Sequence, residues 1–382
     1  MQHEIVVIGG GPVGATLALA LACSGRHTLL IEATTAATHP ANDDPRTLAL
    51  SAGSRLILER IGVWADIASA TPIRTIHVSQ RGGFGRAILK AEACNVPALG
   101  YVVPYAALQL ALARAVAASN EISVMSGTHA VGVHAGERLA EIQLAPPAGR
   151  VRARLAVVAD GGSARVAPAE VEVHDYGQTA LVANVIASKP HAWTAYERFT
   201  PEGPVALLPR GQGYALIWTL EPEHADRLLA AHEQVFLRQL QYAFGARAGT
   251  FVSTSARSLV PLRLRIARRT AFERTLLVGN AAQTLHPVAG QGLNLGLRDA
   301  WELAERIGDA GDPGRSPLVE DYARTRRRDR WSNIVLTDGL VRLFTNDLAP
   351  LRWLRGCGLT SLDCLPPAKL VFVRAMMFGR PF

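Results

Sequence analysis

Three glycines near the start of the sequence could hold a phosphate group. Gly9, Gly11 and Gly14 follow the β-branched run at residues 4–8, and residues 15–23 are rich in alanine and leucine, which favours a helix. Glycine lets the backbone come close to a phosphate, and the first amides of a helix donate hydrogen bonds to phosphate oxygens. The order of strand, glycines and helix therefore predicts a phosphate-binding turn.

Two further residues extend this prediction to a whole dinucleotide. Pro12 suits the first turn of the helix, and Glu32 ends a second predicted strand at residues 28–31. A carboxylate at that place can accept hydrogen bonds from an adenosine ribose. The three glycines, Pro12 and Glu32 are therefore candidate cofactor-binding residues. The pattern fits FAD and NAD alike, while Glu32 disfavours NADP because a 2′-phosphate would meet a negative charge. A simple glycine turn in an ordinary βαβ unit is the alternative.

A second glycine-rich segment lies far along the chain, at residues 279–294. It follows a predicted strand at residues 275–278 and leads into a predicted helix at about residues 293–307. A pair of glycines flanks a glutamine where this helix begins. Such a sequence predicts a nest of backbone amide donors that faces an electron-rich group.

Residues 279–294 resemble the second flavin-binding fingerprint of the class A flavoprotein hydroxylases, which are FAD-dependent aromatic hydroxylases. The resemblance implies that the residue after Gly279 contacts the ribityl chain of FAD, and that the Pro-x-x-Gly-Gln-Gly-x-Asn loop lies along the isoalloxazine ring. Asn280 replaces the family's aspartate; its carbonyl can still accept a hydrogen bond, but one negative charge is absent. The flavin-binding residues implied here are Gly279, Asn280, Gly290, Gly292, Leu293 and Asn294.

Three other residues lie in segments that resemble the same family. Asp160 matches an Asp-Gly motif at a strand end, but the spacings to Ser163 and Arg165 are each one residue shorter, so only the strand and the Asp-Gly pair are carried over. A surface turn is the alternative there. Arg46 matches an arginine that lies close to the flavin, with a solvated helix start as the alternative. Gln109 aligns with a glutamine near the flavin pyrophosphate and ribityl chain.

The resemblance narrows to the hydroxylases of ubiquinone biosynthesis, and within them it is strongest to the 2-octaprenyl-6-methoxyphenol hydroxylases. It rests on residues 196–204, 206–209 and 279–287 and extends over about residues 4–378. It implies tightly bound FAD, NAD(P)H as reductant, dioxygen as co-substrate and no second nucleotide-binding unit. The implied reaction is hydroxylation of the aromatic ring of a polyprenylated phenol through a flavin C4a-hydroperoxide.

Two residues of the second glycine-rich segment are candidates for catalysis. His286 is the titratable group nearest to the flavin by motif position, and it could act as a general base toward the phenol. A hydrogen bond that only stabilises the loop is an equal alternative. Pro287 would wall the site above the ring. Two other functions stay open, namely hydroxylation of a small soluble aromatic and a non-catalytic flavin-binding role in a biosynthetic complex.

The composition limits what else the protein could be. Apolar residues make up 49% and charged residues 19% of the 382 residues, which excludes a disordered or low-complexity chain. Only three of the 40 basic residues are lysines, so the net charge of +8 is almost wholly arginine. An anionic ligand or membrane surface could explain it, with biased coding as the alternative, and we predict no nucleic-acid partner. The four cysteines and eleven histidines show no metal-ligand spacing, so we expect no metal.

Two segments bear on membrane contact. Residues 5–25 carry no charge over 21 positions, but their glycines and Pro12 favour a buried strand and helix over a membrane span, so we expect a cytoplasmic protein. Residues 331–382 hold six basic and three acidic side chains among many apolar ones. Such a helical end could rest peripherally on the inner face of an anionic membrane. Docking on the FAD-binding part, or on another subunit of a ubiquinone-biosynthesis complex, is the alternative.

A particular set of elements is needed to bring these residues together. The resemblance implies an α/β protein with a Rossmann-like FAD-binding domain, a mixed-sheet substrate domain like that of p-hydroxybenzoate hydroxylase, and a helical C-terminus. The length agrees, because a single core stops growing at roughly 250–300 residues. We expect a discontinuous FAD-binding domain over residues 1–72, 98–178 and 268–330. The substrate domain would comprise residues 73–97 and 179–267, and the helical region residues 331–382.

Overall fold

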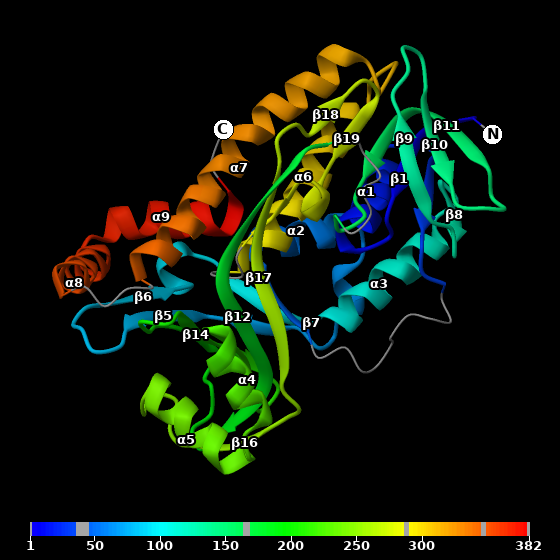
Figure 1. Ribbon diagram of the computed structural model, residues 1–382. Coiled ribbons are helices and arrows are strands. Elements are labelled where there is room, and N and C mark those ends of the chain that lie inside the picture. Colours follow the sequence, from blue (N-terminus) through cyan, green and yellow to red (C-terminus); the bar gives the residue numbers. More distant parts are fainter. Residues whose placement is uncertain (1, 36–45, 163–168, 286–289, 345–348, 380–382) are drawn as a thin grey trace.

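The computed structural model describes residues 2–35, 46–162, 169–285, 290–344 and 349–379 of the chain (Figure 1). Its strands form two large sheets and one small sheet, and its longest helices lie toward the end of the chain. No helix within the described residues combines the length and the apolar character that a membrane span requires.

The first sheet carries the N-terminal strand at its centre. Its main strands lie in the order β18 (Ala271–Phe272), β19 (Thr275–Leu277), β11 (Arg150–Val158), β1 (Gln2–Ile8), β2 (Thr28–Glu32) and β8 (Ile122–Ser126). β1 pairs in parallel with both β11 and β2, as a βαβ unit requires. Ile5, Val6 and Val7 are fully buried because both faces of the sheet are covered. β9 (Ala130–His134) and β10 (Ala140–Leu144) extend this sheet as an antiparallel hairpin beside β11.

Three helices pack together beside the first sheet. They are α1 (Pro12–Cys23), α3 (Tyr105–Ala118) and α6 (Gln291–Ile307). α1 is apolar on all sides, and Leu17 and Leu21 are completely buried in the largest hydrophobic core of the protein. Because a helix that is apolar all round must be covered on every side, α1 lies between the sheet and its two neighbouring helices.

The second sheet is mostly antiparallel and forms one wall of a cavity. Its strands lie in the order β20 (Gln283–Thr284), β17 (Ser258–Ala267), β12 (Val171–Ala187), β15 (Gly213–Leu220), β14 (Pro204–Arg210), β13 (Thr194–Phe199), β5 (Thr75–Gln80) and β6 (Arg86–Lys90). β16 (Phe251–Thr254) pairs with β12. Helices α4 (Pro222–Ala230) and α5 (Glu233–Phe244) cover one face around Phe236, Leu240 and Trp218. The opposite face is left for the cavity.

A small sheet joins the two large ones. It consists of β3 (Thr47–Ser51), β7 (Gly100–Pro104) and β4 (Thr71–Ile73), and it leads directly into α2 (Ala52–Arg60) and α3. The Ser51 hydroxyl accepts a hydrogen bond from the Ser54 amide and so caps α2. Short 3₁₀ helices occupy Trp64–Asp66, Glu92–Cys94 and Gly279–Ala281.

Three helices complete the described chain. α7 (Ser316–Phe344) runs from the first sheet toward α8 (Ala349–Cys364) and α9 (Pro366–Phe378), which lie beside β5 and β6 (Figure 1). α8 packs tightly on the β5–β6 turn, since a Cβ atom on Gly85 would come within 2.3 Å of the Gly356 carbonyl oxygen. The predicted α/β fold with a helical end is confirmed, whereas the proposed domain boundaries stay a prediction.

Candidate active site

The three glycines of the first turn differ in the space around them. Gly9 has φ of +104° and passes so close to β11 that a Cβ atom would lie 2.6 Å from the Ala159 carbonyl oxygen. A Cβ atom on Gly14 would lie 1.9 Å from the Gly9 oxygen, so this glycine lets α1 pack on the turn. A Cβ atom on Gly11, by contrast, would meet no described part of the chain within 4 Å. Gly11 therefore borders open space at the start of α1, where Pro12 is the first helical residue.

Glu32 lies beside this turn, at the carboxyl end of β2. Its two carboxylate oxygens accept hydrogen bonds from the Gly10 and Thr34 amides, which fix the side chain against the glycine turn. The position is the one at which a dinucleotide's ribose lies when its pyrophosphate sits on the neighbouring helix.

Gln109 reaches the same turn from α3. Its side-chain amide donates a hydrogen bond of 2.9 Å to the Gly10 carbonyl oxygen. The Oε1 atom of Gln109 is buried and has no hydrogen-bond partner within the described chain. A buried acceptor without a donor is costly in a folded protein. A ribityl hydroxyl of FAD is a donor that would satisfy it, so the residues around the turn fit this cofactor.

Motifs that are far apart in the sequence meet next to the turn. Gly279 has φ of +59°, and a Cβ atom there would lie 3.0 Å from the Val13 side chain of α1. A Cβ atom on Gly162 would lie 2.8 Å from the carbonyl oxygen of Asn280. Asp160, whose carboxylate accepts a hydrogen bond of 2.9 Å from the Gly162 amide, therefore lies close to the segment that begins at Gly279.

The start of α6 presents amides that no side chain of the helix caps. Gly290 is the N-cap residue, and its φ of +61° is a left-handed conformation that glycine adopts easily. A Cβ atom on Gly292 would meet no atom of the described residues within 4 Å. The amides of Gly292 and Leu293, in the first turn of the helix, can thus face an electron-rich ligand.

Asn294 braces this helix start rather than offering its side chain to a ligand. Its Oδ1 accepts hydrogen bonds of 2.7 Å from the Ser51 amide and from the Ser54 hydroxyl. Its Nδ2 donates to the carbonyl oxygens of Ala49 and Gly290, at 2.9 and 2.6 Å. The side chain is 2% exposed. Its sequence position predicted contact with the flavin, but nothing in the sequence pointed to these partners in β3 and α2.

Of the remaining predicted residues, the structure describes Arg46 but not the two catalytic candidates. Arg46 stacks on the ring of Tyr105, with its guanidinium carbon 3.9 Å from the ring centroid. This places Arg46 at the N-terminal end of α3, the helix that carries Gln109. His286 and Pro287 lie outside the described residues, as do Ser163 and Arg165. The role of each sequence-predicted residue in binding or catalysis stays a proposal.

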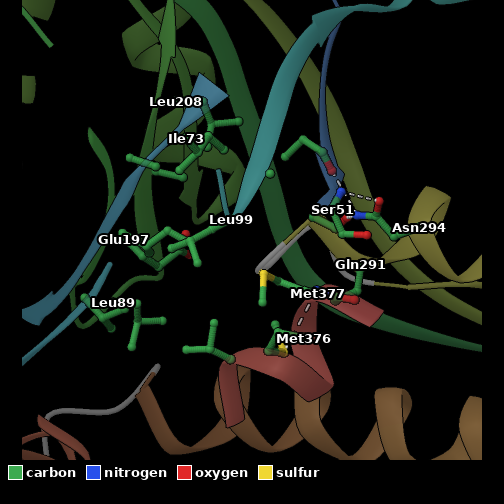
Figure 2. Close-up of a pocket in the computed structure, with 18 of the residues that line it drawn as sticks. Ser51, Ile73, Leu89, Leu99, Glu197, Leu208, Gln291, Asn294, Met376 and Met377 are labelled. Atoms are coloured by element: carbon green, nitrogen blue, oxygen red, sulfur yellow. Dashed lines mark hydrogen bonds between the residues drawn. The ribbon is translucent and has the colours of Figure 1, made fainter. Parts of the chain in front are cut away.

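A cavity of about 650 Å³ joins the start of α6 to the second sheet (Figure 2). Apolar side chains of β5, β6, β13 and β14 form one wall, and Met376 and Met377 of α9 lie across from Leu208 and Ile73. Ser51, Gln291 and Asn294 line the cavity at the start of α6. The volume lies within the range of about 300–1,000 Å³ that is usual for sites binding small organic molecules.

Glu197 is the residue of this cavity that the sequence did not reveal. Among the described residues that line the cavity it is the only carboxylate, and Arg355 is the only cation. Burial raises the pKa of the Glu197 carboxyl to about 7. Alternation along β13 could have indicated that Glu197 shares a face with Ala195 and Phe199. The sequence alone did not show that this face meets a cavity.

Comparison with known proteins identifies the class. A family model described as the FAD-binding domain matches residues 2–336. In fold, the chain is similar to p-nitrophenol 4-monooxygenase PnpA from Pseudomonas putida, with a TM-score of 0.79 over the whole of both chains at 17% identity. The chain therefore belongs to the family described by this FAD-binding domain, and FAD is its cofactor.

Similar proteins of known name indicate the group within the family to which the chain belongs. Ubiquinone hydroxylase UbiL from Rhodospirillum rubrum is 34% identical, and the alignment covers 98% of this chain and 89% of that protein. The 3-demethoxyubiquinol 3-hydroxylase of Escherichia coli is 31% identical, over 94% of each chain. These relatives confirm the predicted membership in the ubiquinone-biosynthesis hydroxylases. The protein is therefore an aromatic-ring monooxygenase that uses NAD(P)H and dioxygen.

Proposed function

We propose that the protein hydroxylates the aromatic ring of a polyprenylated phenol during ubiquinone biosynthesis. The observation that carries this proposal is the position of the cavity. It begins at the open amides of α6, where the flavin ring would lie, and continues along apolar side chains to Leu354 and Leu359 of α8. A phenol ring can thus lie beside the flavin while an apolar chain extends toward the helices.

The protein's own residues have distinct tasks in this reaction. FAD, when bound, supplies reduction by NAD(P)H and activation of dioxygen. The amides of Gly292 and Leu293 can stabilise negative charge at the edge of the ring that they face. Apolar side chains of the second sheet exclude water from the reacting atoms, which strengthens every electrostatic interaction inside the cavity. Gln109 and Glu32 hold the ribityl and ribose parts in place.

The cavity reaches the surface beside an exposed apolar patch. Leu354 lines the cavity and is nevertheless 56% exposed. Trp353, which is 62% exposed, lies next to it on α8, and its ring meets that of Phe84 at a centroid distance of 6.1 Å. We call Phe84, Trp353 and Leu354 the entrance patch. Arg352 directly precedes Trp353 on α8.

We propose that the entrance patch rests on an anionic bilayer. A polyprenyl phenol is dissolved in the membrane, so a cavity that opens at the bilayer surface can admit it without passage through water. Exposed aromatic side chains with nearby arginines are the side chains that interfacial membrane contact requires. A docking surface for another subunit of the pathway is the competing role, and vesicle binding separates the two.

The quinone intermediates of a deletion strain test the proposed function. A strain of the source organism without this protein should accumulate a polyprenyl phenol that lacks one ring oxygen, and an intact copy should restore the normal profile. Mass spectrometry of the lipid extract measures both. An unchanged quinone profile, in a strain shown to hold no redundant hydroxylase, would contradict the proposal. Accumulation of a small soluble aromatic would favour the alternative substrate class.

A further inference from the structure

Glu197 projects from the middle of β13 into the cavity. It is opposite Val78 of β5 in the parallel pairing and opposite Ala206 of β14 in the antiparallel pairing, and both neighbours line the same cavity. Successive side chains of a strand point to opposite faces. Glu197 therefore shares its face with Ala195 and Phe199, and Figure 2 shows its side chain among apolar ones, including Leu89 and Leu99.

The carboxyl group of Glu197 has no partner among the residues that the structure describes. Within the described chain it makes no hydrogen bond and no ion pair, and burial is the sole cause that raises its pKa to about 7. A carboxyl group in an apolar wall costs stability unless it is paired. Such an uncompensated group next to a cofactor site is typical of functional residues.

The charged side chains next to Glu197 on β13 and its neighbouring strands form no ion pair with it within the described residues. Arg198 of the same strand points to the opposite face, as does His77 of β5, and burial together with the charge of Arg247 lowers the pKa of both groups. Tyr196 packs on that face too, with its ring 5.5 Å from that of Phe244.

In the cavity itself, Arg355 of α8 is buried and donates a hydrogen bond of 2.9 Å to the Leu343 carbonyl oxygen. No cation among the described residues acts on the pKa of Glu197. The carboxylate is therefore available to a ligand.

We propose that the Glu197 carboxylate is a catalytic base that binds the hydroxyl group of the substrate phenol and accepts its proton. This inference rests on the proposed function, because it requires a phenol in the cavity. The same cavity is lined by Gln291 and Gly292 at the start of α6 and by Glu197 on the sheet. A ring held between them presents its hydroxyl to the carboxylate and a ring carbon to the flavin.

The proton balance is simple. The phenol O–H bond breaks, a carboxyl O–H bond forms on Glu197, and the freed electron pair moves into the ring, which attacks the oxygen atom derived from dioxygen. When the ring carbon releases its hydrogen as a proton, Glu197 returns its own proton to the phenol oxygen. The ring gains one oxygen atom as a hydroxyl group, and the other oxygen atom leaves as water, which takes up the proton released by the ring carbon. NAD(P)H supplies the two electrons as a hydride, and the solvent supplies one further proton. A base whose pKa lies near the working pH is well suited to this exchange.

The test compares Glu197→Gln with the wild-type holoenzyme. Glutamine keeps the shape of the side chain but cannot accept the proton, so kcat should fall about 10²- to 10⁴-fold, while substrate binding changes much less. The wild-type kcat/KM should rise through a pH of about 7, and the variant should lack this rise. A ring-fluorinated substrate, which is already ionised at the assay pH, should restore much of the variant's activity. Glu223→Gln, on the exposed start of α4, is the matched control.

A second measurement does not depend on turnover. The infrared band of a protonated carboxyl group should titrate near neutral pH in the FAD-loaded wild type and be absent from Glu197→Gln. If Glu197→Gln keeps the kcat and the pH profile of the wild type, the proposal is overturned. If kcat falls only in His286→Asn, the base is His286 instead. If the wild-type enzyme hydroxylates no polyprenyl phenol, the proposed function fails, whereas the infrared titration still reports on Glu197.

Discussion

Asn294 and Glu197 are both polar side chains on the cavity, but their environments differ. Asn294 makes four hydrogen bonds within the protein, to β3, α2 and its own helix start. Glu197 makes none within the described residues. Because hydrogen bonding to protein groups satisfies Asn294, it fixes geometry. Because nothing satisfies Glu197, it is the residue that can respond to a ligand.

The stability of the protein should depend on pH through Glu197. Burial raises its pKa from 4.5 in the unfolded chain to about 7 in the folded one, so the folded state disfavours the carboxylate. Below pH 4.5 both states are protonated, and between pH 4.5 and about 7 the unfolded state loses its proton first, so the wild type loses stability as pH rises. The unfolding free energy of Glu197→Gln, relative to wild type, should therefore grow across this window, by at most about 3 kcal/mol.

Denaturant unfolding at a series of pH values measures this difference. Glu223→Gln should show a constant difference from wild type, because its side chain is exposed in α4. A constant difference for Glu197→Gln as well would mean that the cavity does not disfavour the charged carboxylate.

Individual residues differed in how far the sequence revealed them. The glycines were predictable because each local pattern requires a glycine, and the structure gives Gly9 and Gly14 close contacts that a Cβ atom would not tolerate. Glu197 was not predictable, because its importance depends on β5, β14 and α8 closing around it. Asn294 was noticed for its motif, but three of its four hydrogen-bond partners come from a segment more than 200 residues earlier.

At the scale of elements, the start of α1 contains a glycine whose effect on cofactor binding can be measured separately from its effect on folding. Gly11 has φ of −64° and ψ of 179°, a conformation open to any residue, and a Cβ atom there would meet nothing. We predict that Gly11→Ala keeps the unfolding free energy of the FAD-free protein within about 0.5 kcal/mol of wild type. Its affinity for FAD should fall at least about tenfold, because the methyl group enters the space of the pyrophosphate.

Fluorescence titration with FAD and denaturant unfolding measure the two quantities. Gly311→Ala is the control, since its Cβ atom also meets no described atom within 4 Å, but it follows the far end of α6 rather than the start of α1. Unchanged FAD affinity in Gly11→Ala would place the pyrophosphate elsewhere.

The junction of α6 and α7 shows what the sequence could not resolve among elements. The cluster of arginines near residue 326 reads as a basic surface, yet Arg326 is buried and contacts three carboxylates, those of Asp299, Glu302 and Asp329, at 2.7, 2.6 and 2.8 Å. Although burial opposes its charge, these carboxylates raise the pKa of Arg326. Part of the net positive charge is thus used to hold α7 on α6. Only the packing of the two helices distinguishes Arg326 from the exposed Arg324.

At the scale of the whole molecule, the cavity depends on parts from the beginning, middle and end of the chain. Ser51, Glu197, Gln291 and Met376 come from four different regions and line one space. The fold class and the cofactor were predictable, since the flavin motifs are local and long. The extent of the cavity was not, because helices α8 and α9 carry no motif and their place is set by packing on β6 and α2.

The proposed membrane contact belongs to the scale of the whole molecule, and it predicts vesicle binding. Phosphatidylglycerol-containing vesicles should co-sediment with the wild-type holoenzyme, less so at high salt because Arg352 contributes. The double variant Phe84→Ser and Trp353→Ser should bind about tenfold or more weakly, since it removes two apolar side chains from the entrance patch. Val252→Ser, an exposed apolar position on β16, is the control. Equal binding of all three proteins would favour a subunit contact at the patch, which light scattering would detect.

Hydroxylation of a defined substrate tests the central claim most directly. Purified FAD-loaded protein is supplied with NAD(P)H, isotopically labelled dioxygen and a short-chain polyprenyl phenol in detergent. Mass spectrometry then measures the mass of the product. The account predicts a product that carries one labelled oxygen atom on the ring, formed together with one oxidised NAD(P)H. NAD(P)H oxidation that ends only in hydrogen peroxide for every prenylated phenol, with labelled hydroxylation of a small soluble aromatic, would contradict it.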